Sequence, residues 1–294
     1  MRFTFCLLFI FITVFSFSKK KTVNSERKLQ TTASVSLNSN GMAPVPAFSL
    51  DKPAIMASIS LVKNRFSYEP TLAYGLDSRP WFIDNWMHYK LIVRPAFELR
   101  TGFNPSSYFS EYAPTDEFVW HCQRYFTFEV AGMYKFSPAG SLSMLYWNDR
   151  GQEPESIKGH YLAFFCDRSE INIGNKIQMN LNVQLFYINY DGNNDGLFIS
   201  PKISSSVRNS PFSLFFQANQ PLQSNITPFP KFKCNAGISY SLWTFKASLK
   251  ILSKLLSFLK QFLFRIVLNK SSIESKIGKV YWLSIEVFIT SNHD

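Results

Sequence analysis

The stretch Ile177-Gln178-Met179-Asn180-Leu181-Asn182-Val183-Gln184-Leu185 decides the fold class of this 294-residue chain. Apolar residues at its odd-numbered positions alternate with amide residues at the even-numbered ones. Successive side chains of a β-strand point to opposite faces, so the stretch predicts a strand with one apolar and one polar face. The same period of two dominates from about residue 33 to residue 245. It is clearest over 55–61, 66–74, 126–135 and 212–219.

About twelve such strands fit between residues 33 and 244, and the connections between them indicate the architecture. A soluble sandwich would turn the apolar faces inward, whereas a transmembrane barrel would turn them towards lipid. The shorter connections are 63–65, 94–95, 137–140, 174–176 and 208–211. They alternate with mostly longer ones at 40–53, 77–87, 105–121, 150–158, 191–195 and 222–231. Tight periplasmic turns, longer external loops and an even strand number are typical of outer-membrane barrels. We therefore expect an all-β fold, a single antiparallel transmembrane β-barrel.

Two further features bear on this expectation. The fourth strand, 88–93, is shorter than the ~9 to 11 residues that a span requires, so it must extend into the turn after it or the loop before it. Aromatic residues gather at the strand ends and loops assigned to the external side, where an interfacial girdle is expected. These residues are Trp81, Trp86, Trp120 and Trp147, with Tyr74, Tyr108, Tyr112, Tyr161, Tyr187 and Tyr190.

The composition excludes several other classes of protein. Apolar residues make up 46% of the chain, so the chain is too apolar to be disordered. Charged residues make up 17%, against about 25% in ordinary soluble domains. Beyond the extreme N-terminus, no stretch approaches the ~18 apolar residues of a membrane helix, which excludes a helical bundle. The four cysteines are scattered and have no metal-ligand spacing. The chain has a formal charge of +11, but outside the tail its sequence has no basic patch interleaved with aromatic residues, which disfavours nucleic acid as a partner.

The two ends of the chain differ from the barrel segment, 33–245. Residues 1–18 resemble a cleavable signal peptide, with an apolar core before the small residues Ser16 and Ser18, and 19–32 follow as a periplasmic segment. Residues 246–294 predict an appended basic amphipathic helix, with leucines on one face and lysines on the other. This tail is either a helix lying on an anionic membrane surface or an aberrant extension, such as a translated frameshift. The second interpretation is favoured, because barrel proteins are expected to end at their last strand.

Three segments carry a resemblance to a known family. They are Asn40-Gly41-Met42-Ala43-Pro44-Val45-Pro46-Ala47-Phe48, Arg79-Pro80-Trp81-Phe82-Ile83-Asp84-Asn85-Trp86 and Tyr187-Ile188-Asn189-Tyr190-Asp191-Gly192-Asn193-Asn194-Asp195-Gly196. Over roughly residues 31 to 243 the chain resembles a family of Gram-negative outer-membrane β-barrel proteins. The resemblance implies the fold and the outer membrane, and it brings no catalytic residue with it. In that compartment the expected partners are outer-membrane lipid, lipopolysaccharide and the barrel-assembly machinery.

The inward positions give the best indication of function. The expected lumen-lining residues are Asn180, Asn182, Gln184, Glu98, Arg100, Glu129, Lys202, Gln217 and Asn219. Small amides and hydroxyls permit water but supply no strong selectivity, so the leading hypothesis is a small passive channel for polar solutes. The alternatives are a non-conducting structural or surface-interaction barrel and, third, a membrane-embedded enzyme. None of His88, His121 and His160 stands near a serine motif, so no catalytic residue is proposed. The loop 105–121 is the segment expected to decide whether the lumen is blocked.

One motif points weakly to a metal ion. Asp191, Asn193 and Asp195 match the opening of a calcium loop, D-x-[DN]-x-[DN]-G, in which oxygen atoms surround a hard cation. The twelfth position, where a bidentate glutamate belongs, is Lys202. A β-hairpin loop uses the same Asp, Asn and Gly residues for its backbone geometry, so the hairpin interpretation is preferred. Calcium is the one cofactor considered.

Overall fold

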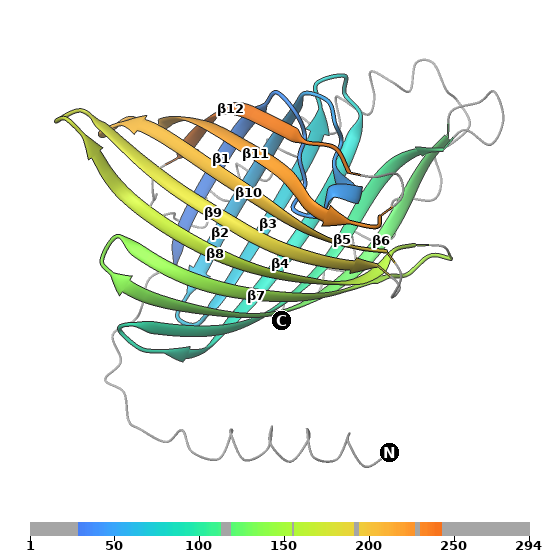
Figure 1. Ribbon diagram of the computed structural model, residues 1–294, viewed down its shortest axis with the longest axis horizontal. Helices are drawn as coiled ribbons and strands as arrows, with labels where there is room; N and C mark the ends of the chain where they lie inside the picture. Colours follow the sequence, from blue (N-terminus) through green and yellow to red (C-terminus); the bar gives the residue numbers. More distant parts are fainter. Residues whose placement is uncertain (1–28, 113–118, 155, 191–193, 227–229, 243–294) are drawn as a thin grey trace, which may run out of the picture.

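The structure is a computed structural model that describes residues 29–112, 119–154, 156–190, 194–226 and 230–242. Twelve antiparallel strands form one closed barrel in which each strand pairs with its neighbours in sequence and β1 closes against β12 (Figure 1). The strands are β1 (Gln30–Asn38), β2 (Ala54–Lys63), β3 (Phe66–Gly75), β4 (Pro80–Val93), β5 (Phe97–Tyr112), β6 (Val119–Ser137), β7 (Gly140–Gly151), β8 (Lys158–Ile173), β9 (Ile177–Tyr190), β10 (Asn194–Val207), β11 (Phe212–Ser224) and β12 (Lys233–Leu242). The predicted fold class and strand number are confirmed.

The alternating pattern places large apolar side chains on the outside of the barrel. On β11, Leu214 is 61% exposed and Phe216 is 51% exposed, whereas Asn219, on the opposite face, is 7% exposed. The same outward exposure holds for Phe128 and Val130 on β6. A closed barrel leaves no unpaired strand edge, so an exposed apolar exterior is suited to lipid. Within the described residues, no helix is long and apolar enough to cross a membrane.

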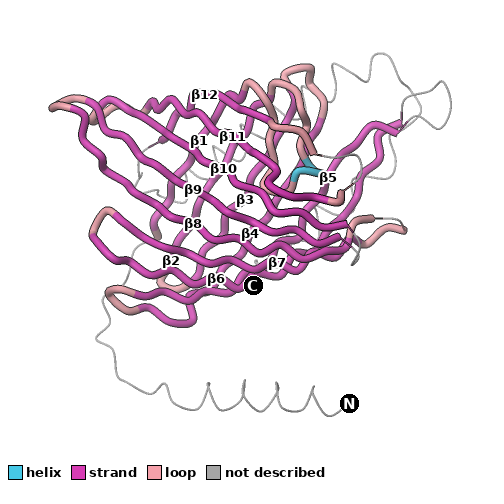
Figure 2. The backbone as a smooth tube through the Cα atoms, viewed as in Figure 1, coloured by secondary structure: helices cyan, strands magenta, loops and turns pink. Residues whose placement is uncertain are grey.

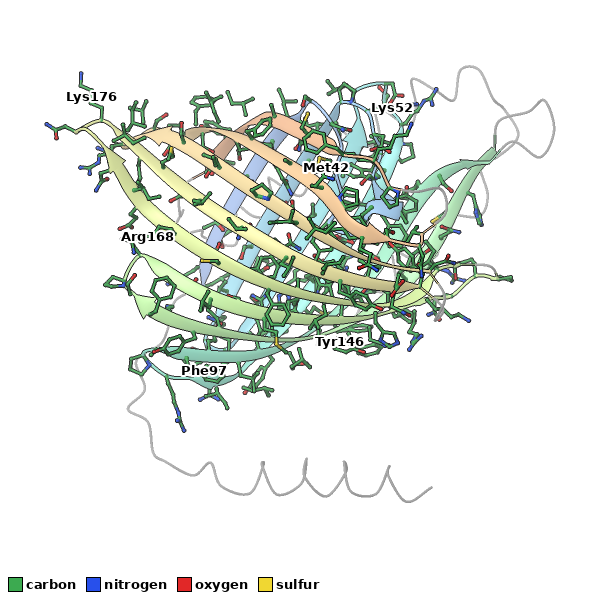
Figure 3. The ribbon with its side chains drawn as sticks, in the orientation of Figure 1. Met42, Lys52, Phe97, Tyr146, Arg168 and Lys176 are labelled. Atoms are coloured by element: carbon green, nitrogen blue, oxygen red, sulfur yellow. The ribbon has the colours of Figure 1, made fainter. Side chains whose placement is uncertain are left out.

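The two ends of the barrel differ in their connections. At one end, the short-turn end, the strands are joined by 64–65, 94–96, 138–139, 174–176 and 208–211. At the other, the loop end, the connections are 39–53, 76–79, 113–118, 152–157, 191–193 and 225–232. Figure 3 labels Arg168 and Lys176 towards the short-turn end, on the left, and Met42 and Lys52 towards the loop end.

The predicted alternation of short and long connections is only partly correct. Residues 80–87 and 105–112 were expected in loops but belong to β4 and β5, and the connection 76–79 is tight. The fourth strand therefore extends into the segment before it, one of the two extensions that its short predicted length required. In the run Pro80-Trp81-Phe82-Ile83 a β-bulge inserts Trp81 as an extra residue opposite β3, so that Trp81 and Phe82 both pack inward and the period of two is broken.

Removing the tail is expected to leave the barrel intact. The ring is closed by residues 30–242 alone, and β12 pairs with both β11 and β1 over its length. A chain lacking residues 246–294 should keep its heat-modifiable migration in gels and its β-sheet circular dichroism. Loss of that spectrum from the truncated chain, with the full chain unaffected, would contradict the division. The predicted signal peptide and tail helix lie outside the described residues, so the division remains a prediction.

Candidate functional site

The interior wall of the barrel carries all nine residues that the sequence suggested for the lumen. Each lies opposite the outward apolar row of its strand, and several of their side chains bond to polar residues of neighbouring strands. Asn182 donates to Asp167 Oδ1 at 2.6 Å, Gln217 donates to Ser200 Oγ at 3.1 Å, and Gln184 donates to the Tyr161 hydroxyl. The Lys202 ammonium lies 4.9 Å from the centre of the Phe215 ring. The interior is thus a polar network on the wall of β8 to β12.

A cluster of charged side chains occupies the wall of β4 to β7. Glu129, which is only 3% exposed, accepts from Arg100 Nε at 2.8 Å and from Trp147 Nε1 at 2.9 Å. His88 Nε2 lies 3.4 Å from the same carboxylate. Glu98 pairs with Lys90 at 2.8 Å. The pairing of Arg100 with Glu129 makes this cluster a brace between strands, and His88 is its member that the sequence did not reveal.

Gly102 makes this cluster possible. His88 on β4 and Glu129 on β6 flank β5, and their side chains meet above Gly102, which is the register partner of both. A Cβ at this position would lie 2.6 Å from His88 Cδ2 and 3.1 Å from Glu129 Cβ. The glycine therefore provides space for a contact between strands that are not neighbours.

Six of the ten aromatic residues predicted for an interfacial girdle turn inward, which corrects the girdle for Trp81, Trp86, Trp147, Tyr108, Tyr161 and Tyr190. The side chains of Tyr112 and Trp120 lie outside the described part of the chain. Trp81 and Tyr161 are buried at 0% and 1% exposure, and Trp147 and Trp86 pack against each other at 5.2 Å between ring centres. The aromatic series continues around the wall through Tyr161 to Phe186 and Phe198. Tyr146 and Tyr187 do face outward. Because aromatic residues occupy both faces here, their position along the chain could not reveal which face they take.

The connection 39–53, termed here the lumen segment, fills the loop end. Its short 3-10 helix, η1 (Pro46–Phe48), is drawn in cyan in Figure 2, close to β5. Trp81 Nε1 donates to the Phe48 carbonyl at 2.7 Å, and the Phe48 ring lies 5.0 Å from the rings of both Tyr108 and Tyr125. Val45 is buried in the cluster that contains Tyr161. The loop 105–121 was expected to decide blockage, but the described blocking segment is 39–53, and Tyr108 is part of the wall beneath it.

Two of the cavities among the described residues bear on function. The vestibule, at the short-turn end, has a volume of about 770 Å³ and is lined mainly by small hydroxyl side chains from β1, β2, β3, β10, β11 and β12, with Glu69 and Trp86. The loop-end cavity, beneath the lumen segment, has a volume of about 100 Å³. Trp86 lines both cavities, so it stands at the boundary between them. The interior is therefore roomy and polar at one end and packed at the other.

The candidate calcium residues are only partly described. Asp191 and Asn193 lie outside the described residues. Asp195 belongs to β10, and its Oδ2 accepts a hydrogen bond from the Tyr187 hydroxyl at 2.8 Å. In the part of the chain that the structure describes, no group of three or more His, Cys, Asp or Glu side chains is placed to hold a metal ion. The calcium site remains a prediction.

Comparison with known proteins finds similarity among solved structures only. No protein-family model and no curated protein matches the chain. The KdgM porin is similar with a TM-score of 0.48 and 11% identity over 72% of this chain and 99% of that one. An outer membrane channel from Pseudomonas putida F1 gives 0.46 and 9% over 76% and 100%, and the NanC porin gives 0.45 and 7% over 73% and 100%.

The closed strand pairing and the apolar exterior decide the class to which this chain belongs. The chain is an outer-membrane β-barrel. A closed, antiparallel ring of an even number of strands, apolar outside and polar inside, is the architecture of that class. The fold does not specify the function of this barrel, which depends on the side chains of its interior.

Proposed function

We propose that this barrel is a small passive channel for polar solutes, closed at its loop end by the lumen segment. The observation that carries the proposal is the vestibule of about 770 Å³, which a barrel serving only as a scaffold does not need. Its lining includes Ser34, Ser58 and Ser60 from two neighbouring strands. Small hydroxyl groups can bond to water and to polar solutes alike, so this half of the lumen can hold a hydrated molecule.

The charges in the interior favour weak selectivity. Arg100 and Lys90 are each paired with a glutamate, and those pairs lie on one wall. The opposite wall carries amides and hydroxyls around one ammonium group, that of Lys202. Strong ion selectivity in pores comes from rings of charge of one sign. Among the described residues the lumen carries charges of both signs and no ring of one sign, which suits neutral polar solutes.

The second candidate function is a non-conducting scaffold, and the filled loop end favours it. Val45 and Phe48 pack among side chains from β5 to β10, which leaves little space for a solute to pass. The two candidates differ in whether the lumen segment leaves its position. The main polar attachment of η1 to the wall is the bond from Trp81 to the Phe48 carbonyl, a modest constraint of about 1 kcal/mol.

Planar-bilayer recordings test the proposal. Replacing residues 43–48 by a glycine-serine segment removes Val45 and Phe48 from the lumen, so we expect steady unitary currents from the variant and small or brief ones from the native chain. The matched control replaces the turn 174–176 at the opposite end, where Gly174 has nothing within 4 Å of its Cβ position, and should behave as the native chain does. If the native chain and the segment variant are both heat-modifiable yet silent at all voltages, the scaffold function replaces the channel.

A further inference from the structure

The loop-end cavity combines carboxylate and aromatic side chains. Its wall holds two carboxylates, Asp84 on β4 and Asp149 on β7. Six aromatic rings surround them. These are Phe48, Phe82, Trp86, Tyr108, Tyr125 and Trp147. The site is thus formed by the lumen segment together with β4, β5, β6 and β7.

Neither carboxylate has a cationic partner among the described residues. Asp84 Oδ1 accepts a hydrogen bond from Asn104 Nδ2 at 3.1 Å, and Asp149 Oδ1 accepts one from the Thr127 hydroxyl. Arg150, next to Asp149 in β7, acts on the Asp149 carboxylate electrostatically but forms no ion pair with it, since successive residues of a strand face opposite sides. Neutral hydrogen bonds compensate only part of the free-energy cost of burying a carboxylate. Buried charges in proteins are therefore normally paired with an opposite charge. A bound cation would stabilise the charged form of both carboxyl groups, which their burial disfavours.

The aromatic rings indicate which kind of cation suits the cavity. The Phe48 ring lies at 53° to the Tyr108 ring and at 69° to the Tyr125 ring, so three rings enclose one side at different angles. Trp86 and Trp147 enclose another side, tilted by 31°. Aromatic faces attract cations, and cages of this kind hold methylated ammonium groups. A metal ion such as Ca²⁺ would instead require six to eight oxygen ligands, which two carboxylates in an aromatic cage do not supply.

We propose that the loop-end cavity binds a small organic cation carrying a methylated ammonium group. The carboxylates of Asp84 and Asp149 supply the charge, and the aromatic rings replace the water around the methyl groups. The volume of about 100 Å³ accommodates one such group and excludes a larger polar solute. Trp86 borders the vestibule as well, so the vestibule is the route of entry. Binding does not depend on conduction, and the site holds its ligand whether or not the barrel passes solutes.

A titration with a charged ligand and its neutral analogue tests this proposal. Choline and 3,3-dimethylbutan-1-ol have nearly the same shape and differ in the charge of the quaternary centre. Each is added to the refolded full chain in detergent, and binding is followed by calorimetry and by tryptophan emission, since Trp86 and Trp147 line the cavity. We expect choline to bind at least roughly tenfold more tightly than the alcohol, because only the charged ligand makes cation–π contacts and pairs with the carboxylates. Equal affinity for the two compounds, or no binding of choline, overturns the proposal.

Single variants place the ligand within the barrel. Asp84→Asn and Asp149→Asn keep the shape of each side chain and remove its charge, so each should weaken choline binding by roughly tenfold while leaving the alcohol unaffected. Asp167→Asn is the matched control, because Asp167 is an interior carboxylate bonded to Asn182 and lies outside the cavity. It should bind choline as the native chain does. If Asp167→Asn alone weakens binding, the assigned site is wrong. Choline binding by the native chain, when that chain and the segment variant are both silent in bilayers, would refute the channel and leave this site standing.

Discussion

Arginine in place of Val183 is expected to destabilise the folded barrel by about 2 to 4 kcal/mol in an unfolding titration with lipid vesicles. Val183 lies near the middle of β9 and pairs in register with Cys166, which is exposed on the outer face, and with Pro201. An arginine there must place its charge among acyl chains or bend towards the headgroups, and both cost free energy. Tryptophan emission as a function of denaturant measures the loss.

The neighbouring residue provides the matched control. Asn182 faces the interior, donates to Asp167 at 2.6 Å and borders a cavity of about 320 Å³ that also contains Arg100 and Glu98. Arginine at Asn182 would find water and the Asp167 carboxylate, so its cost should be below about 1 kcal/mol. Equal costs at positions 182 and 183 would contradict the assignment of faces. Recovery of the native mature chain as a soluble monomer without detergent would contradict the membrane assignment itself.

Gly102→Ala is expected to have the second large effect, a loss of about 1 to 3 kcal/mol from overpacking. The added Cβ would stand 2.6 Å from the His88 ring, and that ring cannot easily move because it is stacked on Trp86 at 5.2 Å and 4°. Displacing His88 or Glu129 would also weaken the cluster around a buried carboxylate, and breaking a buried charge pair costs about 3 to 5 kcal/mol. The same denaturant titration measures the change.

Gly132 on β6 provides the control for this substitution. It lies on the outer face, where the nearest atom to an added Cβ is a ring carbon of Phe97 at 3.9 Å, so Gly132→Ala should change stability by no more than about 0.5 kcal/mol. The double variant Gly102→Ala with His88→Ala should recover part of the loss, because the clashing ring is gone. A neutral effect of Gly102→Ala alone would show that the contact between β4 and β6 can relax without cost.

The sequence by itself determined the barrel strands, because the alternation of apolar and polar residues within one strand specifies which face of that strand each residue occupies. Ile177 to Leu185 alternates without interruption, so one face must be apolar and the other polar, whatever the neighbours are. The inward position of Asn182, Gln217 and Lys202 follows from the same alternation. The pairing of Arg100 with Glu129 was also foreseeable, since these two residues of opposite charge face the interior from the neighbouring strands β5 and β6.

Only the tertiary structure decided what fills the ring. Alternation is broken where a β-bulge turns two neighbouring residues to the same face, and so Pro80 to Ile83 looked like a loop and Trp81 looked like an interfacial residue, although it is fully buried. The lumen segment has no period of its own, and its place is fixed by contacts with residues far away in sequence, such as that between Phe48 and Tyr125. The loop-end cavity likewise joins Asp84 and Asp149, which lie on strands β4 and β7. A period of two specifies the face of a residue, whereas the closure of the barrel brings those residues together across the lumen.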